Sequence, residues 1–376
     1  MNLSVNDDGI YNTETYTVSC EEAVLAGRAA ASVRENIVIG YDKECQTCFH
    51  ALASGIMSQG KKLWDAGICT QAQLRFCIRE SSADCGIFIE NCCGNKKLLL
   101  FSSGGHTLTS EEEKEFTEAI NENRTLEDVS SEGQIISADV LSDMYFTGMK
   151  QKFISLKNCN IKINSSSKII RDFALENLPQ RNCSPETVTF SIPGNGLRAS
   201  AYSDETGCVF WEKLVLICCN DEFEKGKDMA LPCDFPVIAE KTAASWNRII
   251  YRYDPSSSNL SDVSKKEMSL EFPFLTDGLY LAGRIAWIMH TRCCTFASLL
   301  RDIPDFTTTV KYVKIHGDPA DKIRRIQENE VCCRSDSGRI VARKSKSGKS
   351  LVLYAESYST ESADELCSSW IRDLDI

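Results

Sequence analysis

Residues 37–57, IVIGYDKECQTCFHALASGIM, carry the pattern that decides the fold. Residues 37–40 form a short apolar run of the kind found in a buried strand. Apolar side chains then recur with helical spacing at Phe49, Leu52, Ala53, Ile56 and Met57. A buried strand followed directly by an amphipathic helix is the repeating unit of an α/β fold.

The same unit recurs on both sides of this stretch. Ser19 and Glu22 have the spacing of a capping box before an Ala-rich helix, and Ser110 with Glu113 predicts a second box. Between the two boxes we expect strands at residues 62–65 and 85–90 and a helix at 70–80. This alternation predicts a largely parallel sheet, with ligands bound at the carboxyl ends of its strands.

The rest of the chain continues in shorter blocks. The expected helices cover residues 136–153, 238–246, 277–290, 296–302 and 319–329. The expected strands cover residues 160–163, 187–192 and 249–253, and residues 256–264 have the composition of a loop. Strands at 338–343 and 351–356, followed by an amphipathic helix, predict a small α+β module at the end of the chain.

Composition limits the possible partners. The 376 residues are 43% hydrophobic and 25% charged, which excludes a disordered chain, and the formal charge of −11 disfavours a nucleic-acid or anionic membrane partner. The 19 cysteines are odd in number and include four adjacent pairs, so we expect reduced thiols. No run of 18 apolar residues and no basic, then apolar, leader occurs in the sequence. We therefore expect a cytoplasmic protein.

The order and spacing of several segments resemble the α-D-phosphohexomutases, the superfamily of phosphoglucomutase, phosphomannomutase and phosphoglucosamine mutase. NDDGIYN near residue 9 is similar to the family's GTDGIRG, and DCGIFIENCCGN stands where GIMITASHNP is expected. TVTFSIPGNGLRASAYSDETG resembles the metal-loop region LGIAFDGDADR. FLTDGLYLAGRIAW resembles TGDGLLAALLLLE, and GRIVARKSKSGKSLVLYAES is similar to the phosphate-loop segment WVLVRPSGTEPKLRVYVEA.

The resemblance implies an α/β fold of four domains, three related α/β domains with mixed sheets and a small C-terminal α+β domain. The corresponding boundaries are 1–150 for the first domain, 151–222 for a shortened second, 223–312 for the third and 313–376 for the fourth.

The family's reaction requires a serine nucleophile, a divalent cation and cationic groups that hold phosphate. The nucleophile's position falls on Cys92, and the three metal-binding aspartates fall on Pro193, Asn195 and Leu197. Arg198 stands at the position of the family's arginine. No carboxylate remains to bind a hard cation, so the resemblance implies a degenerate active site.

Two further family segments are altered. Tyr11 and Tyr41 replace arginines, and residues 264–274 do not match the sugar-selecting motif. The counterpart of the phosphate loop keeps or gains cations and hydroxyls, which are compatible with an anion site, although a solvated β-hairpin turn explains them more simply. These candidate phosphate-binding residues are Arg343, Ser345, Lys346, Ser347 and Lys349.

Cys45 and Cys48 form a C-x-x-C pair that follows a strand and opens a helix, where the helix dipole lowers a thiol pKa. This pair indicates redox chemistry, although the Trp and Pro typical of thioredoxin motifs are missing. Zinc bound by Cys45, Cys48 and His50 would need a fourth ligand that the sequence does not identify.

Our interpretation is a phosphohexomutase homologue without catalytic activity, which binds a protein partner, a sugar phosphate or another anion and needs no cofactor. An active mutase, which would require magnesium, and a thiol oxidoreductase that uses Cys45 and Cys48 are the alternatives.

Overall fold

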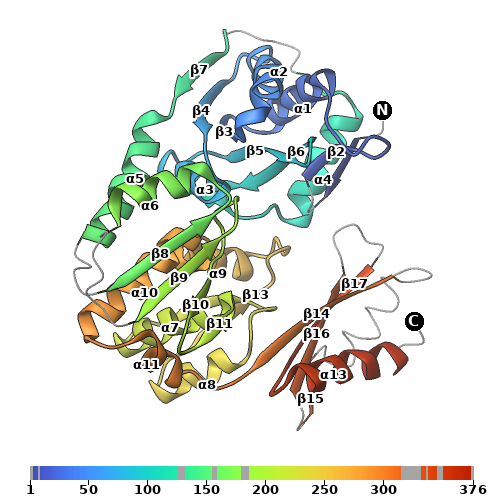
Figure 1. The fold of residues 1–376 in the computed structure, drawn as a ribbon. Helices are drawn as coiled ribbons and strands as arrows, with labels where there is room; N and C mark the ends of the chain where they lie inside the picture. Colours follow the sequence, from blue (N-terminus) through green and yellow to red (C-terminus); the bar gives the residue numbers. More distant parts are fainter. Residues whose placement is uncertain are drawn as a thin grey trace.

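The computed structural model describes residues 3–6, 9–125, 132–154, 159–178, 186–314, 332–335, 338–344 and 350–373. It is an α/β fold with four sheets among these residues. The first two sheets are mixed, the third is parallel and the fourth is antiparallel. Figure 1 shows the first sheet and its helices at one end, with the second and third sheets below it and the C-terminal sheet at their side.

The first sheet has the strand order β1-β2-β6-β5-β3-β4-β7. Its central strands are parallel, whereas β6, β2 and β1 continue it in antiparallel order. The strands are β1 (Leu3–Asn6), β2 (Gly9–Asn12), β3 (Asn36–Tyr41), β4 (Lys62–Ile68), β5 (Cys85–Cys92), β6 (Asn95–Ser102) and β7 (Gln134–Ser137).

Both faces of this sheet are covered, which explains the unbroken apolar run of β3. Ile37 and Ile39 pack under α1 (Cys20–Val33), α2 (Gln46–Met57) and α4 (Ser110–Asn121). Val38 faces the opposite side and packs with α3 (Gln71–Glu80). Short 3-10 turns η1 (Lys43–Cys45) and η2 (Ser103–Gly105) follow β3 and β6.

Helices α1 and α2 approach closely at two glycines. A Cβ atom on Gly27 would lie 2.3 Å from the carbonyl oxygen of Leu52, and one on Gly55 would lie 2.2 Å from that of Val24. Such distances leave no room for a side chain, so the two glycines allow this helix pair to form.

The second and third sheets share one hydrophobic core. The second sheet, in the order β11-β10-β9-β8, contains β8 (Asn160–Ser165), β9 (Thr187–Ile192), β10 (Ser200–Ser203) and β11 (Gly207–Val209). The third pairs β12 (Met229–Pro232) with β13 (Ile250–Tyr253) in parallel. The surrounding helices are α5 (Asp139–Ile154), α6 (Lys168–Asn177), α7 (Trp211–Glu224), α8 (Ile238–Ser245), α9 (Leu260–Ser269), the turn η3 (Pro273–Leu275), α10 (Gly278–Arg292) and α11 (Phe296–Arg301).

The C-terminal module is an antiparallel sheet in the order β14-β17-β16-β15, backed by α13 (Thr360–Asp373). Its strands are β14 (Thr307–Lys314), β15 (Cys332–Ser335), β16 (Gly338–Lys344) and β17 (Ser350–Ser357). The Glu356 carboxylate accepts hydrogen bonds from the backbone N–H groups of Val237, at 2.6 Å, and Ile238, at 3.0 Å. This contact attaches the module to the first turn of α8.

Most of the expected elements are confirmed within a few residues, and the capping box of Ser19 and Glu22 is present. The second box was placed wrongly, because Thr109 and Glu112 form it. Residues 134–137, partly expected as helix, form β7, and α9 begins inside the expected loop because the Asn259 side chain caps it. The expected helix at 319–329 lies outside the described residues.

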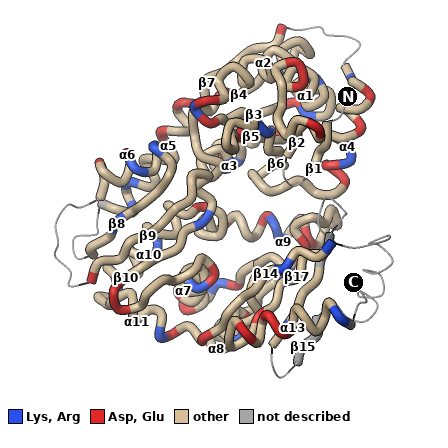
Figure 2. Tube along the Cα trace, turned by 45° about the vertical axis from the view of Figure 1, so that its right-hand side comes forward, with Lys and Arg blue, Asp and Glu red and all other residues tan. Residues whose placement is uncertain are grey.

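Two features bear on the expected domains and partners. Helix α5 and strand β14 cross the predicted boundaries at 150 and 312, and the four-domain division stays a prediction. Figure 2 shows Lys and Arg interspersed with Asp and Glu throughout the described fold. No helix among the described residues is long and apolar enough to cross a membrane.

Candidate functional site

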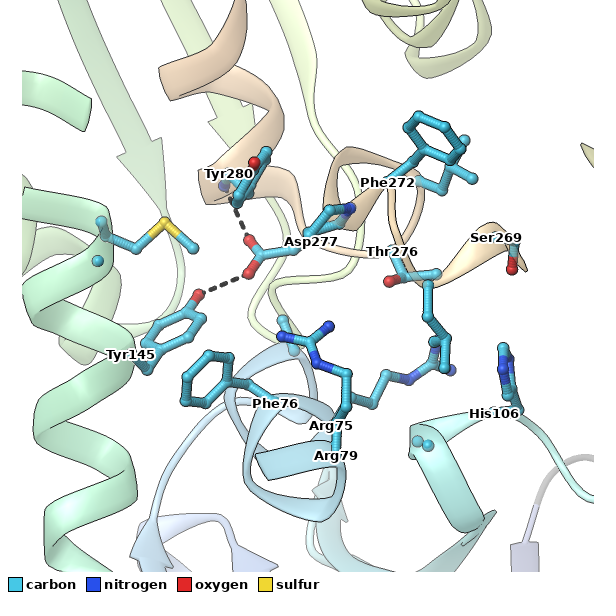
Figure 3. Close-up of a pocket in the computed structure, with 18 of the residues that line it drawn as sticks. Arg75, Phe76, Arg79, His106, Tyr145, Ser269, Phe272, Thr276, Asp277 and Tyr280 are labelled. Atoms are coloured by element: carbon cyan, nitrogen blue, oxygen red, sulfur yellow. Dashed lines mark hydrogen bonds between the residues drawn. The ribbon is translucent and has the colours of Figure 1, made fainter. Parts of the chain in front are cut away.

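A pocket lies where the first sheet's helices meet the shared core of the second and third sheets. It has a volume of about 170 Å³ and is lined by side chains from α3, α5, the residues after η2, and the segment from α9 to α10. Figure 3 shows Tyr145 and Asp277 on one side of it and His106 on the other. We call it the interdomain pocket.

Asp277 is the buried carboxylate of this pocket and the N-cap of α10. Its side chain accepts hydrogen bonds of 2.9 Å from the Tyr145 hydroxyl and from the backbone N–H of Tyr280 (Figure 3). Burial raises the pKa of Asp277 to about 6, although these two hydrogen bonds and the positive charge of Arg79 act in the opposite direction.

Arg75 and Arg79 lie one helical turn apart on α3 and supply positive charge to the pocket. The Arg75 guanidinium lies 4.9 Å from the centre of the Phe101 ring, and that of Arg79 lies 5.3 Å from the centre of the Phe76 ring. Burial lowers the pKa of Arg75 to about 10. Burial, together with the charge of Arg75, lowers the pKa of His106 to about 4, so His106 is neutral at pH 7.

The turn that replaces the metal loop holds two helices in place beside this pocket. The Asn195 carbonyl accepts a hydrogen bond of 3.2 Å from the N–H of Ala72, in the first turn of α3. The Gly196 carbonyl accepts one of 2.7 Å from the N–H of Gly278, the first residue of α10. The Asn195 side chain accepts the N–H of Leu197 at 3.1 Å. The turn thus satisfies N–H groups that helix starts leave unpaired.

The counterpart of the nucleophile loop is a tight hairpin between β5 and β6. Cys92 pairs with Asn95, and Cys93 and Gly94 form the turn with positive φ angles. The Asn91 side chain accepts the N–H of Gly94 at 3.1 Å. Cys92 and Cys93 are exposed, and neither lines the interdomain pocket. Cys92 and Asn195 both lie outside the lining of this pocket.

Arg198 lies in a second, larger cleft between the shared core and the C-terminal sheet. Its guanidinium lies 4.5 Å from the centre of the Trp211 ring. The cleft has a volume of about 440 Å³, and Tyr312 and Arg339 line its opposite side. Trp211, Pro232 and Phe235 line both this cleft and the interdomain pocket, so the two adjoin.

The structure corrects the expectation of acidic thiols at Cys45 and Cys48. Both side chains are fully buried, with free thiols. Burial, with a contribution from the negative charge of Asp42, raises the pKa of Cys45 to about 12. Burial raises the pKa of Cys48 to about 11. Desolvation of the thiolate therefore outweighs the helix dipole.

The remaining predicted positions form no metal site in the part of the chain that the structure describes. His50 is exposed, and the described His, Cys, Asp and Glu residues contain no group of three or more that could hold a metal ion. Arg343 belongs to β16, whereas Ser345, Lys346, Ser347 and Lys349 lie outside the described residues.

Comparison with known proteins agrees with this architecture. Residues 6–127 match the family model of phosphoglucomutase/phosphomannomutase, α/β/α domain I. The first third of the chain therefore matches the first domain of the phosphohexomutases. A phosphoglucosamine mutase of Pediococcus pentosaceus is 29% identical over 122 residues, which cover 29% of this chain and 27% of that enzyme.

Two solved structures extend the likeness of the phosphohexomutase fold over the chain. A phosphoglucomutase/phosphomannomutase family protein of Burkholderia thailandensis has a TM-score of 0.75 at 14% identity, with 98% of this chain and 96% of that chain covered. A Thermus thermophilus protein assigned as a phosphomannomutase has a TM-score of 0.72 at 12% identity, with 99% of both chains covered. At these identities the likeness establishes the fold.

The residues of the interdomain pocket were missed by reasoning from sequence. Arg75, His106 and Asp277 lie on three segments far apart in the chain, and none belongs to a motif that indicates chemistry by itself. Asp277 was noted only as part of the Thr-Asp-Gly segment. An Asp at the start of an expected helix predicts a cap, which is its local role here.

Proposed function

We propose that this phosphohexomutase homologue binds a phosphorylated ligand without transferring its phosphoryl group. The turn at residues 193–197 carries the proposal. Phosphoryl transfer in this family needs a divalent cation, and a hard cation needs several oxygen ligands, mainly carboxylates. Pro193, Asn195 and Leu197 supply no carboxylate, and the carbonyls of Asn195 and Gly196 already accept hydrogen bonds from helix starts.

The hairpin at Cys92 supports the same conclusion. An acceptor of the phosphoryl group must lie beside the bound substrate and the cation. Cys92 instead lies at an exposed two-residue turn. A loss at either position alone would slow catalysis, and the two losses together remove both the nucleophile and the charge that stabilises the transferring group.

The larger cleft is the proposed place for the ligand. Arg198 and Arg339 line it together with the carboxylates of Glu212, Asp234 and Glu356, and guanidinium groups pair well with phosphate oxygens. The candidate phosphate-binding residues from Arg343 to Lys349 belong to the same C-terminal module. A volume of about 440 Å³ falls within the range of small-molecule sites. A protein partner that covers this cleft is the competing occupant.

The test combines an activity assay with a binding assay. Coupled assays for glucose, mannose and glucosamine phosphates, with magnesium and glucose 1,6-bisphosphate, are expected to show no turnover. Turnover that disappears in Cys92→Ala would establish an active mutase instead.

Calorimetric titration with glucose 6-phosphate is expected to detect binding that weakens in the double variant Arg198→Gln, Arg339→Gln. The matched control is Arg301→Gln, an exposed arginine at the end of α11. If the wild type did not bind glucose 6-phosphate, or if all three proteins bound it equally, the proposed ligand site would be wrong. A protein partner would then be the favoured occupant of the cleft.

A further inference from the structure

The interdomain pocket contains three polar groups that the protein leaves without hydrogen-bond partners. They are Nε of Arg75, Nε2 of His106 and Nε1 of Trp211, each fully buried as an atom. Buried polar groups are nearly always paired, because an unpaired one loses its hydrogen bonds to water. Three such groups in the lining of one pocket indicate a missing hydrogen-bonding partner.

All three groups can donate a hydrogen bond. The Nε–H of arginine and the indole N–H of tryptophan are donors only, and the neutral His106 donates when its proton is on Nε2. Arg75 and His106 also lie close enough that the charge of Arg75 lowers the pKa of His106. The missing partner must therefore supply acceptors, and a negatively charged group forms the strongest hydrogen bonds with such donors.

Two acceptor groups of the pocket, in contrast, already take part in hydrogen bonds within the protein. Asp277 accepts from the Tyr145 hydroxyl and from the Tyr280 N–H. The Ser269 hydroxyl accepts from Tyr253 at 3.4 Å and donates to the Lys266 carbonyl at 2.6 Å. The lining therefore favours a ligand with acceptors and few donors.

The remaining walls are aromatic and set the size of the ligand. Phe76, Tyr145, Phe272 and Trp211 surround a space of about 170 Å³. A cavity of about 150 Å³ lined by apolar side chains holds one benzene ring. The space here accepts one ring with a small substituent, and rings stack favourably on aromatic walls.

We propose that the interdomain pocket binds a one-ring aromatic anion, with its carboxylate or phosphate group on Arg75, His106 and Trp211 and its ring among the aromatic walls. This site goes beyond the proposed function, because, of the two cavities, Arg75 and His106 line this pocket only, whereas Arg198 and Arg339 line the larger cleft only. It does not depend on whether the chain transfers phosphoryl groups.

The probes are benzoate and phenyl phosphate, which share the ring and differ in the anionic group, with inorganic phosphate and glucose 6-phosphate as competitors. The binding of each is measured by calorimetry and by the shift of the Trp211 indole N–H resonance, assigned with Trp211→Phe. At least one aromatic probe is expected to bind and to move this resonance, and the tighter of the two identifies the anionic group. Absence of binding for both would overturn the proposal.

Arg75→Met is expected to lower the affinity for the tighter-binding aromatic probe about tenfold or more, because a charge-assisted hydrogen bond is lost. Arg301→Met, outside the pocket, is expected to change nothing. Equal affinity in Arg75→Met and the wild type, or displacement of the aromatic probe by equal concentrations of inorganic phosphate or glucose 6-phosphate, would contradict the assignment.

Gly148 allows a second test that does not depend on Arg75. It lies exposed at the edge of the pocket on α5, and a Cβ atom there would meet nothing within 4 Å. Gly148→Trp is expected to obstruct the pocket and abolish aromatic binding without lowering Tm, whereas Gly148→Ala retains binding. Binding that survives Gly148→Trp would place the probe elsewhere. Glucose 6-phosphate binding in the larger cleft is expected to be unaffected, which separates this test from that of the proposed function.

Discussion

The hydroxyl group of Tyr145 donates a hydrogen bond of 2.9 Å to Oδ2 of Asp277 and thereby joins α5 to the first turn of α10. Both helices pack on the shared core of the second and third sheets. The hydrogen bond also holds a buried carboxylate whose pKa, about 6, lies above the usual range because burial disfavours its charge.

Asp277→Asn is expected to stabilise the protein at pH 7.5. A carboxyl group with a raised folded pKa contributes stability that is fully present below its unfolded pKa and is lost as pH rises through about 6. Asn stays neutral and still caps a helix. We expect a gain of about 1–3 kcal/mol in the free energy of unfolding at pH 7.5, which disappears near pH 4.

Urea unfolding of the variant and the wild type at both pH values measures this gain. His106, whose pKa is lowered, changes stability in the opposite direction over the same range, so only the difference between the two proteins reports on Asp277. Asp305→Asn, at a side chain that is 96% exposed, is the control. A variant that is less stable at pH 7.5 would contradict the assigned cause.

A glycine-to-alanine substitution is expected to have opposite effects on stability at Gly27, where α1 contacts α2, and at Gly148. Gly27→Ala is expected to destabilise the protein by about 1–3 kcal/mol, because the new methyl group would meet the Leu52 carbonyl and push α1 from α2. Gly148→Ala meets nothing within 4 Å and is expected to stabilise α5 by up to about 1 kcal/mol. Thermal unfolding compares them, and equal effects would show that the contact is not tight.

Magnesium and manganese are expected neither to bind tightly nor to raise Tm. A ligand that binds the native state must raise Tm by mass action, and the turn at residues 193–197 offers no carboxylate to either ion. Titration calorimetry and thermal unfolding in each metal measure this. A saturable site that is lost in Asn195→Ala would show that the turn binds metal after all.

Thiol alkylation should separate the cysteines by burial. Cys92 and Cys93 are exposed and are expected to react with iodoacetamide in the native protein. Cys45 and Cys48 are expected to react only after unfolding, because they are buried and their pKa values of about 12 and 11 leave little thiolate at pH 7.5. Mass spectrometry of labelled peptides measures both rates. Fast native labelling of Cys45 would revive the oxidoreductase hypothesis.

The candidate phosphate-binding residues Arg343 and Lys346 provide the last prediction. Arg343→Ala with Lys346→Ala is expected to weaken glucose 6-phosphate binding, and the wild-type affinity is expected to fall as salt rises, because salt screens the attraction between opposite charges. Resonance shifts during titration measure both effects, with Arg301→Ala as the control. Identical weak responses in the variant and the wild type would indicate an ordinary solvated turn.

Local patterns explain how much of the fold could be predicted. The apolar run at residues 37–40 predicted β3, and the helical spacing from Phe49 to Met57 predicted α2. Each pattern lies within a single element and reflects which of its side chains are buried. The capping box at Thr109 was misplaced by one residue because Glu111, Glu112 and Glu113 allow either register. Helix α9 was missed because its Ser-rich start has a loop-like composition, and the cap at Asn259 decides it.

The candidate site was harder to predict because tertiary packing creates it. Arg75 has the spacing of an ordinary helix residue, and only its burial against Phe101 and His106 distinguishes it. Similarly, the C-x-x-C spacing of Cys45 and Cys48 indicates reactivity, whereas the desolvation that raises their pKa depends on the neighbouring helix and sheet. The roles of Cys92 and of the loop after Arg343 remain predictions.

The turn at residues 193–197 also limits how the lineage can change. Under the proposed function, an aspartate restored at position 195 would enter a turn whose carbonyl groups already fix the starts of α3 and α10. A cation bound there would lie beside the hydrogen bonds that position both helices, so a change of this turn would also act on the starts of α3 and α10. Any return of a metal site is therefore coupled to the placement of two helices.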